Sequence, residues 1–336
     1  MFQVINRRKK EILNLFFFLW RRKQVKLLRK TCYNRLMLTF LILVLALIFL
    51  VLIVSFGLFI FIENKNRSIW IQQPQSNDPL YPEWYAFMQA KKEEWCLQTH
   101  DNLTLKAWYL PATKPTDKTI LLANGYKSVR DRYGAFGWLF HELGYNVLMP
   151  DYRAGAKSPG KFIGFGWLDR KDNLGWIKQI IEKNPKSEIA MFGISMGASA
   201  TMMLSGEDLP EHVKCFIEDC GYDTVWNELA HKAKHDYHLP QFPLIHLLSF
   251  WSKLFAGYDW KEASSITQLN KNTKPFLFIH RDQDTFVPME MVHRNYEATK
   301  GPKEIYIAEG GRHVRSYEID KEKYREVVAN FLKTYF

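Results

Sequence analysis

The sequence predicts an α/β protein in which a mostly parallel sheet is flanked by helices, preceded by one transmembrane helix. Apolar, β-rich stretches alternate with helical stretches from about residue 95 onward. An aromatic-rich stretch interrupts this alternation once, and 27 uncharged residues stand near the N-terminus. We therefore divide the chain into a basic segment at 1–35, a transmembrane helix at 36–62, a connector at 63–94 and an α/β domain at 95–336 with an insertion at about 222–265.

The predicted membrane anchor is Leu36–Ile62, which is uncharged and rich in Leu, Ile, Val and Phe. A cleaved signal peptide would have an apolar core of about 7–15 residues and a small-residue cleavage site, whereas Glu63 and a polar stretch follow here. Eleven basic residues precede the run and two follow it closely. The positive-inside rule then predicts a single-pass protein of the cell membrane, held by membrane lipid, with a cytoplasmic N-terminus and an extracellular α/β domain.

The excess of positive charge is confined to the N-terminal segment. Residues 1–35 hold eleven basic residues and one acidic residue, a net charge of +10, whereas residues 36–336 hold 35 basic and 34 acidic residues. We therefore expect no nucleic-acid partner. Within this segment Ile12–Trp20 is apolar but only nine residues long. It is either a segment lying along the inner membrane surface or an irregular cytoplasmic tail, and both interpretations stay open.

The α/β domain is expected to contain seven strands and five helices, judged from apolar patterns and the turn residues between them. The strands are 103–110, 119–123, 146–149, 188–192, 213–218, 276–280 and 304–308, and the helices are 132–143, 169–183, 196–204, 288–299 and 320–335. The connector should be partly helical at 84–94. The insertion should be helical with a break at 239–243, and it should form a lid over the carboxyl ends of the strands, where ligands bind in such sheets.

Residues 193–197 read Gly-Ile-Ser-Met-Gly, directly after an expected strand and directly before an expected helix. Glycines at these two positions allow the close backbone approach that a sharp strand-to-helix turn requires, and such a turn presents the serine hydroxyl to a cleft. A pattern of this kind arises by chance in roughly one chain in ten of this length, so its flanking elements carry the argument. Ser195 is the candidate nucleophile, and the alternative is an ordinary turn serine.

A nucleophilic serine needs a histidine that takes its proton and an acid that orients the histidine. Both residue types follow Ser195 at the ends of expected strands, Asp284 after the sixth strand and His313 after the seventh. Asp219 and Asp282 also stand near strand ends. Asp219 is the main alternative to Asp284 as the acid.

The order Ser, Asp, His and the residues around them resemble the α/β-hydrolase superfamily, in particular its bacterial serine esterase-like members with a GxxDxxVP acid loop. The matching loop here is RDQDTFVP at 281–288. The resemblance covers about residues 95–335 and includes Asn-Gly-Tyr at 124–126, Asp-Tyr-Arg at 151–153 and Gly-Tyr-Asp at 221–223. It departs from the family at Arg281, Ala154, Ala156 and Arg312, where the family usually has Gly or another small residue. Side chains at positions that need a positive φ would reshape these loops.

The resemblance implies an α/β-hydrolase fold and a carboxylesterase-like serine hydrolase that cleaves ester or related acyl bonds through an acyl-enzyme. Ser195 would attack, His313 would carry the proton, Asp284 would orient His313, and the backbone amides of Met196 and Tyr126 would form the oxyanion hole. No metal or organic cofactor is required. The aromatic lid favours a small-molecule acyl substrate with an apolar or aromatic group. The alternatives are a serine peptidase for short peptides and a catalytically inactive surface binding protein.

One further cluster invites a metal interpretation. His231, His235 and His238 follow i, i+4, i+7 spacing and would share one helix face. The HExxH pattern is absent and the sequence places no carboxylate or cysteine beside them, so a solvated lid face is favoured. Glycine-rich loops typical of phosphate or dinucleotide binding are absent as well.

Overall fold

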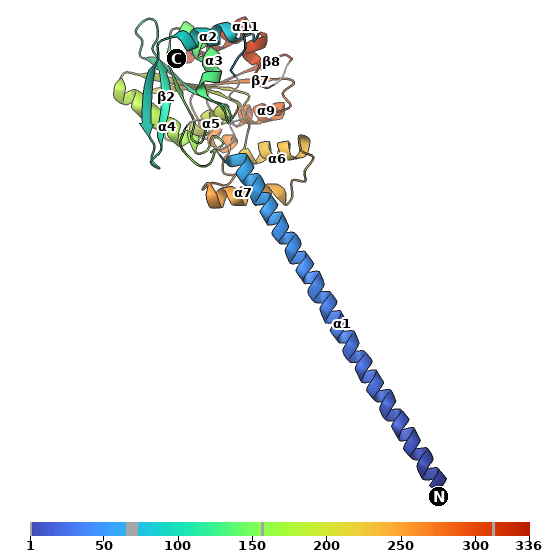
Figure 1. Cartoon of the computed structure of the whole chain (residues 1–336). Helices are drawn as coiled ribbons and strands as arrows, with labels where there is room; N and C mark the ends of the chain where they lie inside the picture. The colour runs from blue at the N-terminus through green and yellow to red at the C-terminus, as the bar shows by residue number, and fades with distance from the viewer. Residues whose placement is uncertain (1, 65–72, 156–157, 311–312) are drawn as a thin grey trace. The chain divides into compact units, whose positions relative to one another are not determined.

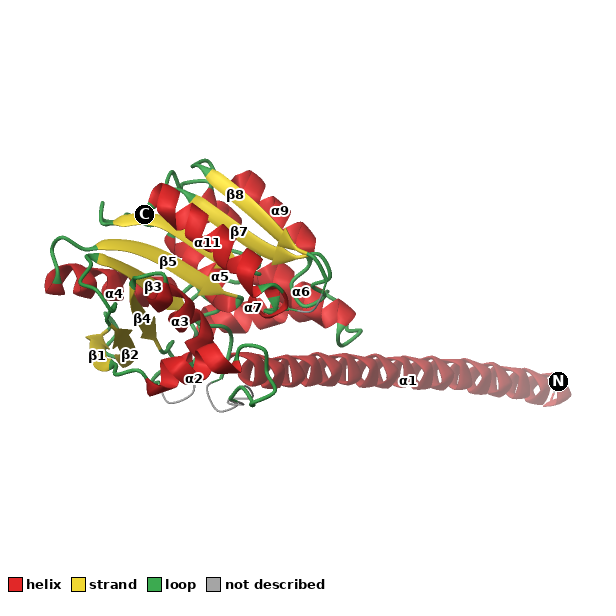
Figure 2. Ribbon diagram, turned by 90° about the horizontal axis from the view of Figure 1, so that it is seen from above, coloured by secondary structure: helices red, strands yellow, loops and turns green. Residues whose placement is uncertain are grey.

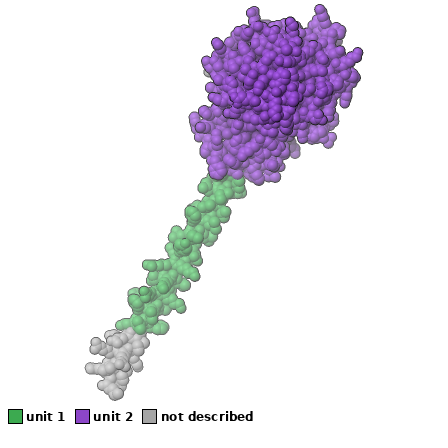
Figure 3. All heavy atoms as spheres, turned by 180° about the vertical axis from the view of Figure 1, so that it is seen from behind, with its two compact units in different colours: residues 1–55 green, residues 56–336 purple. Residues whose placement is uncertain are grey.

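The computed structural model describes residues 2–64, 73–155, 158–310 and 313–336. The chain divides into two compact units, residues 1–55 and residues 56–336 (Figure 3). Helix α1 (Phe2–Glu63) is continuous, and it contains a stretch long and apolar enough to cross a membrane. The segment at 12–20 lies within this helix. The last eight residues of α1, 56–63, belong to the second unit.

The second unit is built on one sheet of eight strands (Figures 1 and 2). The strands are β1 (Glu93–Gln98), β2 (Thr104–Leu110), β3 (Lys118–Ala123), β4 (Asn146–Pro150), β5 (Glu188–Ile194), β6 (Val213–Asp219), β7 (Phe276–Arg281) and β8 (Lys303–Ala308). Their order in the sheet is β1-β2-β4-β3-β5-β6-β7-β8. Pairing is antiparallel for β1 with β2 and for β2 with β4, and parallel for the remaining neighbours.

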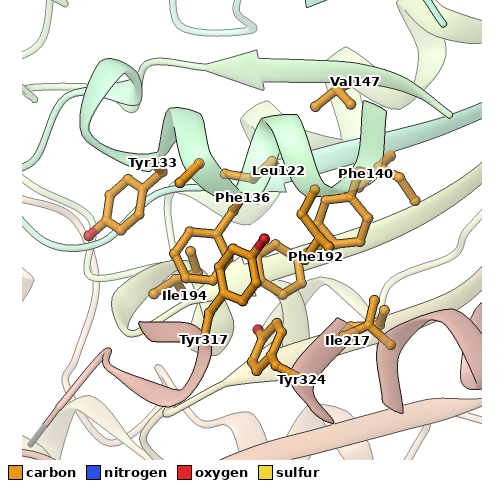
Figure 4. Close-up of a cluster of buried hydrophobic side chains, with 14 of the residues drawn as sticks. Leu122, Tyr133, Phe136, Phe140, Val147, Phe192, Ile194, Ile217, Tyr317 and Tyr324 are labelled. Atoms are coloured by element: carbon orange, nitrogen blue, oxygen red, sulfur yellow. The ribbon is translucent and has the colours of Figure 1, made fainter. Parts of the chain in front are cut away.

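Helices cover both faces of this sheet because successive strand residues point to opposite sides. Ile120 and Leu122 of β3 belong to one core cluster and Leu121 between them belongs to another. The first cluster packs against α2 (Tyr81–Gln89), α3 (Gly134–Glu142) and α11 (Lys321–Tyr335), and the second against α4 (Asp169–Lys183), α5 (Met196–Leu204), α8 (Ser265–Leu269) and α9 (Met289–Ala298). Figure 4 shows the first cluster, in which the rings of Phe136 and Phe192 stack at 5.6 Å.

The seven expected strands are confirmed, each with ends within two residues of the prediction. Helices 169–183 and 196–204 have the predicted bounds, and the remaining three expected helices are shifted by one or two residues. A 3₁₀ turn, Arg130–Tyr133, precedes α3. The connector prediction is wrong beyond Gln89, because α2 ends there and Glu93–Gln98 forms β1. This edge strand is mostly exposed, so two glutamates at its start are tolerated and the apolar alternation is weak.

The insertion between β6 and β7 is helical with a central break, as predicted. It contains α6 (Val225–His235) and α7 (Leu244–Phe255), and residues 236–243 between them are not helical. The buried side chains of this lid form a third core cluster together with Phe59 of α1 and Met196 of α5. The end of α1 is therefore part of the lid packing.

Candidate active site

Ser195 occupies the corner between β5 and α5, with φ of 55° and ψ of −120°. A positive φ is uncommon for a residue with a side chain, and such backbone strain is typical of functional sites. The glycines make the corner possible, because a Cβ at Gly193 would clash with the carbonyl oxygen of Gly197 and one at Gly197 would clash with that of Ala123. The N–H of Ser195 donates to the carbonyl oxygen of Asp219 at 2.8 Å, which ties the corner to β6.

The side chains of Ser195, His313 and Asp284 form one hydrogen-bonded row. The Oγ of Ser195 lies 2.8 Å from Nε2 of His313, and Nδ1 of His313 lies 2.6 Å from Oδ2 of Asp284. Asp284 follows β7 and His313 follows β8, so both stand at the carboxyl edge of the sheet, where the nucleophile corner also lies. With its proton on Nδ1, His313 donates a hydrogen bond to Asp284. Nε2 is then free to accept a hydrogen bond from the serine hydroxyl.

Asp284 is placed to stay ionised although its side chain is fully buried. Its Oδ1 accepts hydrogen bonds from the backbone amides of Phe286 at 2.8 Å and Val287 at 3.0 Å. Burial raises the pKa of Asp284, but the hydrogen bond and charge of His313, with the Val287 amide and the charge of His280, leave it below its usual value. A buried carboxylate in this state can stabilise a positive charge on His313.

The alternative acid, Asp219, faces other partners. Its Oδ1 accepts from the hydroxyl of Ser316 at 3.2 Å and its Oδ2 from the hydroxyl of Tyr324 at 2.9 Å. Burial raises the pKa of Asp219 to about 6, against the lowering effect of these two hydrogen bonds. Asp282, the other acid near a strand end, accepts from the backbone amide of Gly310 at 2.8 Å. The geometry therefore places Asp284, rather than Asp219 or Asp282, against the histidine.

The loop after β3 carries Tyr126, one of the two predicted oxyanion donors, and it lies against the nucleophile. A Cβ at the neighbouring Gly125 would stand 3.7 Å from the Cβ of Ser195. Met196, the other predicted donor, is the first residue of α5 and directly follows Ser195. Both residues are thus beside the serine, at positions where their backbone amides could meet one oxygen of a bound acyl group.

The end of α1 holds this same loop in place. The hydroxyl of Tyr126 donates to the carbonyl oxygen of Ile62 at 2.5 Å, and the Nζ of Lys127 donates to that of Phe61 at 3.0 Å. The last carbonyls of a helix lack partners within the helix, so a hydroxyl and an ammonium satisfy them well. Our sequence analysis missed this contact. Its only signal was the length of the apolar run, 27 residues where a membrane span needs about 20.

A cavity of about 240 Å³ opens beside Ser195 and His313. The described residues that line it are Tyr126, Ser128, Arg132, Tyr133, Ser195, Phe286, His313 and Val314. A second cavity of about 470 Å³ shares Arg132, Tyr133, His313 and Val314 with the first and is otherwise lined mainly by polar residues of 73–80 and by Arg315 and Glu318. The small cavity is therefore mainly apolar, with three aromatic side chains in its lining, and the larger one beside it is mainly polar.

An aromatic contact links the lid to the histidine. The ring of Phe286 stacks on the ring of His313 at 4.6 Å between centroids. On the Phe286 ring lies the Nζ of Lys232, a residue of α6, at 3.2 Å from the centroid. Lys232 of the lid therefore lies on the ring of Phe286, which in turn lies on the ring of His313. These contacts restrict the orientation of the imidazole.

The departures from the family pattern have local explanations where the structure describes them. Ala154 takes a positive φ of 52°, so the left-handed turn is kept although a side chain is present. Arg281 is the last residue of β7 and needs no positive φ; its buried guanidinium donates from Nη2 to the carbonyl oxygen of Glu309 at 3.0 Å. Ala156 and Arg312 lie outside the described residues.

The lid histidines do not form a common face. The rings of His231 and His235 stack at 4.3 Å, whereas His238 lies beyond the last residue of α6. Over the described part of the chain, the two clusters with metal-like spacing are His100 with Asp101 and Asp172, and Cys220 with Asp284 and His313. In the first, Arg153 pairs with both carboxylates, at 2.8 and 2.7 Å. The second contains the acid and the base of the hydrogen-bonded row.

Comparison with known proteins gives one matching family and several relatives. The model of the family described as serine aminopeptidase, S33 (Hydrolase_4) matches residues 114–220, a range that includes Ser195. The uncharacterized protein YqkD of Bacillus subtilis (strain 168) is 30% identical over 277 residues, which cover 82% of this chain and 90% of YqkD.

Solved structures with the same fold include an esterase and a peptidase. The Pyrococcus furiosus esterase Pf2001 is 25% identical with a TM-score of 0.61, over 80% of this chain and 98% of the esterase chain. An acylaminoacyl peptidase of Pyrococcus horikoshii is 17% identical with a TM-score of 0.55, over 72% of this chain and 41% of the peptidase chain. The second likeness extends to the fold alone.

Proposed function

This chain belongs to the α/β-hydrolase superfamily, in one family with YqkD of Bacillus subtilis, and on that premise we propose that it is a membrane-anchored serine esterase acting through an acyl-enzyme. The observation that carries the proposal is the row Asp284–His313–Ser195, with its two contacts of 2.6 and 2.8 Å. Pairing of this kind activates a serine hydroxyl, which is otherwise a weak nucleophile.

The reaction proceeds in two halves. The Oγ of Ser195 attacks the carbonyl carbon of the substrate while its proton passes to Nε2 of His313, and Asp284 stabilises the imidazolium. The backbone amides of Met196 and Tyr126 hold the oxyanion. The leaving group takes the proton from His313 as the acyl-enzyme forms. A water molecule then attacks the acyl-enzyme and gives a proton to Nε2 of His313. His313 returns this proton to Oγ of Ser195 as the carboxylic acid leaves, which restores both residues.

The substrate we propose is a small ester with an apolar or aromatic acyl group. A cavity of about 240 Å³ leaves room for a small acyl group, and Tyr126, Tyr133, Phe286 and Val314 contribute apolar lining. The description of the matching family raises a second candidate reaction, removal of an amino-terminal residue from a peptide. An aminopeptidase needs an acid that pairs with the substrate ammonium. The eight described residues that line the cavity include Arg132 and no Asp or Glu, since the acids Asp78 and Glu318 line the larger cavity beside it, and this favours the ester.

The test is labelling of the full-length protein in detergent with a fluorophosphonate probe, beside Ser195→Ala and His313→Ala. We expect strong labelling of the unchanged protein and its loss in both variants, with circular dichroism unchanged. Panels of short p-nitrophenyl esters and aminoacyl p-nitroanilides then separate esterase from aminopeptidase. A correctly folded protein that the probe does not label would overturn the proposal and favour a binding protein that keeps only the fold.

A further inference from the structure

We propose that the lid helix α7 and the segment before it rest on the membrane surface, with exposed apolar side chains inserted among the lipids. This surface, which we call the lid face, is formed by Tyr237, Leu239, Phe242, Phe250, Leu254 and Phe255. The proposal rests on the membrane anchoring included in the proposed function. It does not depend on the catalytic reaction.

The length of the uncharged run indicates where the chain leaves the bilayer. The uncharged run 36–62 has 27 residues, whereas a hydrocarbon core of about 30 Å is crossed by about 20 residues of helix. Counting from Leu36, twenty residues end at Ser55. The second unit, which holds the candidate active site and which we call the catalytic unit, begins at Phe56. The seven residues 56–62 are thus surplus to the span and pack with the catalytic unit instead. The membrane surface is therefore expected close to Phe56.

Phe56 lies beside helix α7. Its ring is 5.3 Å from the ring of Trp251 and 5.3 Å from that of Phe255, both on α7. The ring of Phe59, one turn further along α1, is 6.1 Å from that of Phe255. Helix α7 is therefore in direct contact with the residues at which the chain emerges from the bilayer, at the same end of the catalytic unit as α6 (Figure 1).

Helix α7 carries both buried and exposed apolar side chains. Ile245 and Leu248 are buried on its inner side, where they already contribute to the apolar core of the lid. The outer side is mainly apolar too, with Phe250 and Leu254 more than half exposed beside the exposed His246 and Lys253. Phe242, just before the helix, is 75% exposed. A helix that is apolar on both sides is suited to contact two apolar surroundings, the protein core on one side and lipid on the other.

These exposed side chains are concentrated rather than scattered. Of the twelve large apolar residues exposed in the described part of the catalytic unit, six lie within the nineteen residues 237–255, and Phe56 and Phe61 at the end of α1 add two more. Single exposed apolar residues are ordinary, but a contiguous patch indicates a contact surface. Since Phe56 at the end of the anchor helix contacts Phe255 of the lid face, the lipid bilayer is the occupant that we infer.

The test measures whether the lid face reaches lipid acyl chains in the full-length protein. The two exposed cysteines are first removed by Cys32→Ser and Cys96→Ser. One reporter cysteine is then introduced and labelled with a small fluorophore, in Phe250→Cys for the lid face or in Leu45→Cys for the span. The matched control is Tyr85→Cys, at a position 49% exposed against 53% for Phe250. It belongs to α2, and Figure 1 shows this helix at the end of the catalytic unit opposite α7.

Each labelled protein is placed in phosphatidylcholine nanodiscs with or without bromine on the acyl chains. We expect strong quenching at position 45, about half as much at position 250, and almost none at position 85. Fluorophosphonate labelling of the same samples reports on Ser195 separately, so a failure of the catalytic proposal is distinguishable from a failure of this one.

Three outcomes would overturn the proposal. Equal, weak quenching at positions 250 and 85 with strong quenching at 45 would leave the anchor in place and remove the lid face from the membrane. Absence of quenching at position 45 would remove the anchor and the lid contact together. Protection of position 250 from both brominated lipid and aqueous iodide would indicate that a second copy of the chain covers the lid face.

Discussion

Two buried aspartates stand near the ends of the neighbouring strands β6 and β7, and their different partners decide their expected roles. Asp284 contacts His313 at 2.6 Å, whereas Asp219 is held by Ser316 and Tyr324. Asp284→Asn keeps an oxygen for the two backbone amides but loses the charge opposite the imidazole. We expect kcat for a p-nitrophenyl ester to fall about 10³–10⁴-fold while the melting temperature stays nearly unchanged.

Asp219→Asn is the matched control for this prediction. We expect its kcat to stay within about tenfold of the unchanged protein, because Asp219 does not contact His313. Its effect should appear in stability instead. Burial raises the pKa of Asp219 to about 6, so the folded chain keeps a proton that the unfolded chain releases above about pH 4. Asp219 should therefore contribute a loss of about 3 kcal/mol of stability as pH rises from about 4 to about 6, and this contribution should be absent from the variant.

Thermal unfolding of both proteins at several pH values between 4 and 7 measures the difference. A large loss of turnover in Asp219→Asn, together with a mild effect of Asp284→Asn, would exchange the roles of the two acids.

At the scale of elements, the sequence was sufficient wherever a local pattern and the tertiary environment agreed. Helix α5 and the corner before it were predictable because glycine and serine chemistry dictates this turn. The acid was harder to predict, since strand ends alone left Asp219 and Asp284 both open. Only packing separates them, through the position of Tyr324 on α11 and of His313 after β8. Strand β1 was missed because its mostly exposed residues carry little apolar signal.

The end of α1 is the element whose role was least visible from the sequence. Hydropathy assigns the whole uncharged run to the membrane span. No feature of the local sequence distinguishes its residues that face lipid from those that pack with protein. In the folded chain Phe59 and Glu63 are fully buried, and the Oε1 of Glu63 accepts from the indole N–H of Trp260 at 2.8 Å. These contacts are long-range, between α1 and the lid, so periodicity does not reveal them.

This arrangement predicts that the fragment 64–336 is impaired whereas 56–336 is not. Removal of 56–63 deletes the buried ring of Phe59 and the two carbonyl oxygens that hold Tyr126 and Lys127. Loss of one buried phenylalanine alone costs about 3–5 kcal/mol. We expect a clearly lower melting temperature and slower fluorophosphonate labelling of the shorter fragment. Equal melting temperatures and labelling rates for the two fragments would show that the end of α1 contributes nothing to the site.

At the scale of the whole molecule, charge and hydrophobicity are arranged along the chain in one direction. Positive charge comes first, then the uncharged run, then a unit that is nearly neutral overall. We infer from this order that the N-terminus is cytoplasmic and that the catalytic unit faces outward. The proposed lid contact adds a second requirement, because it would hold the unit directly on the membrane surface rather than at the end of a flexible tether.

Two native cysteines allow this topology to be tested without foreign fusions. Cys32 precedes the span and Cys96 lies in β1, and both are exposed, whereas Cys215 and Cys220 are buried. A maleimide that does not cross membranes should label intact cells at Cys96 and leave Cys32 unlabelled until the cells are opened. Cys96→Ser should then abolish labelling of intact cells, and Cys32→Ser should leave it unchanged. The opposite pattern would mean that the catalytic unit faces the cytoplasm, so that the eleven basic residues before the span do not set its orientation.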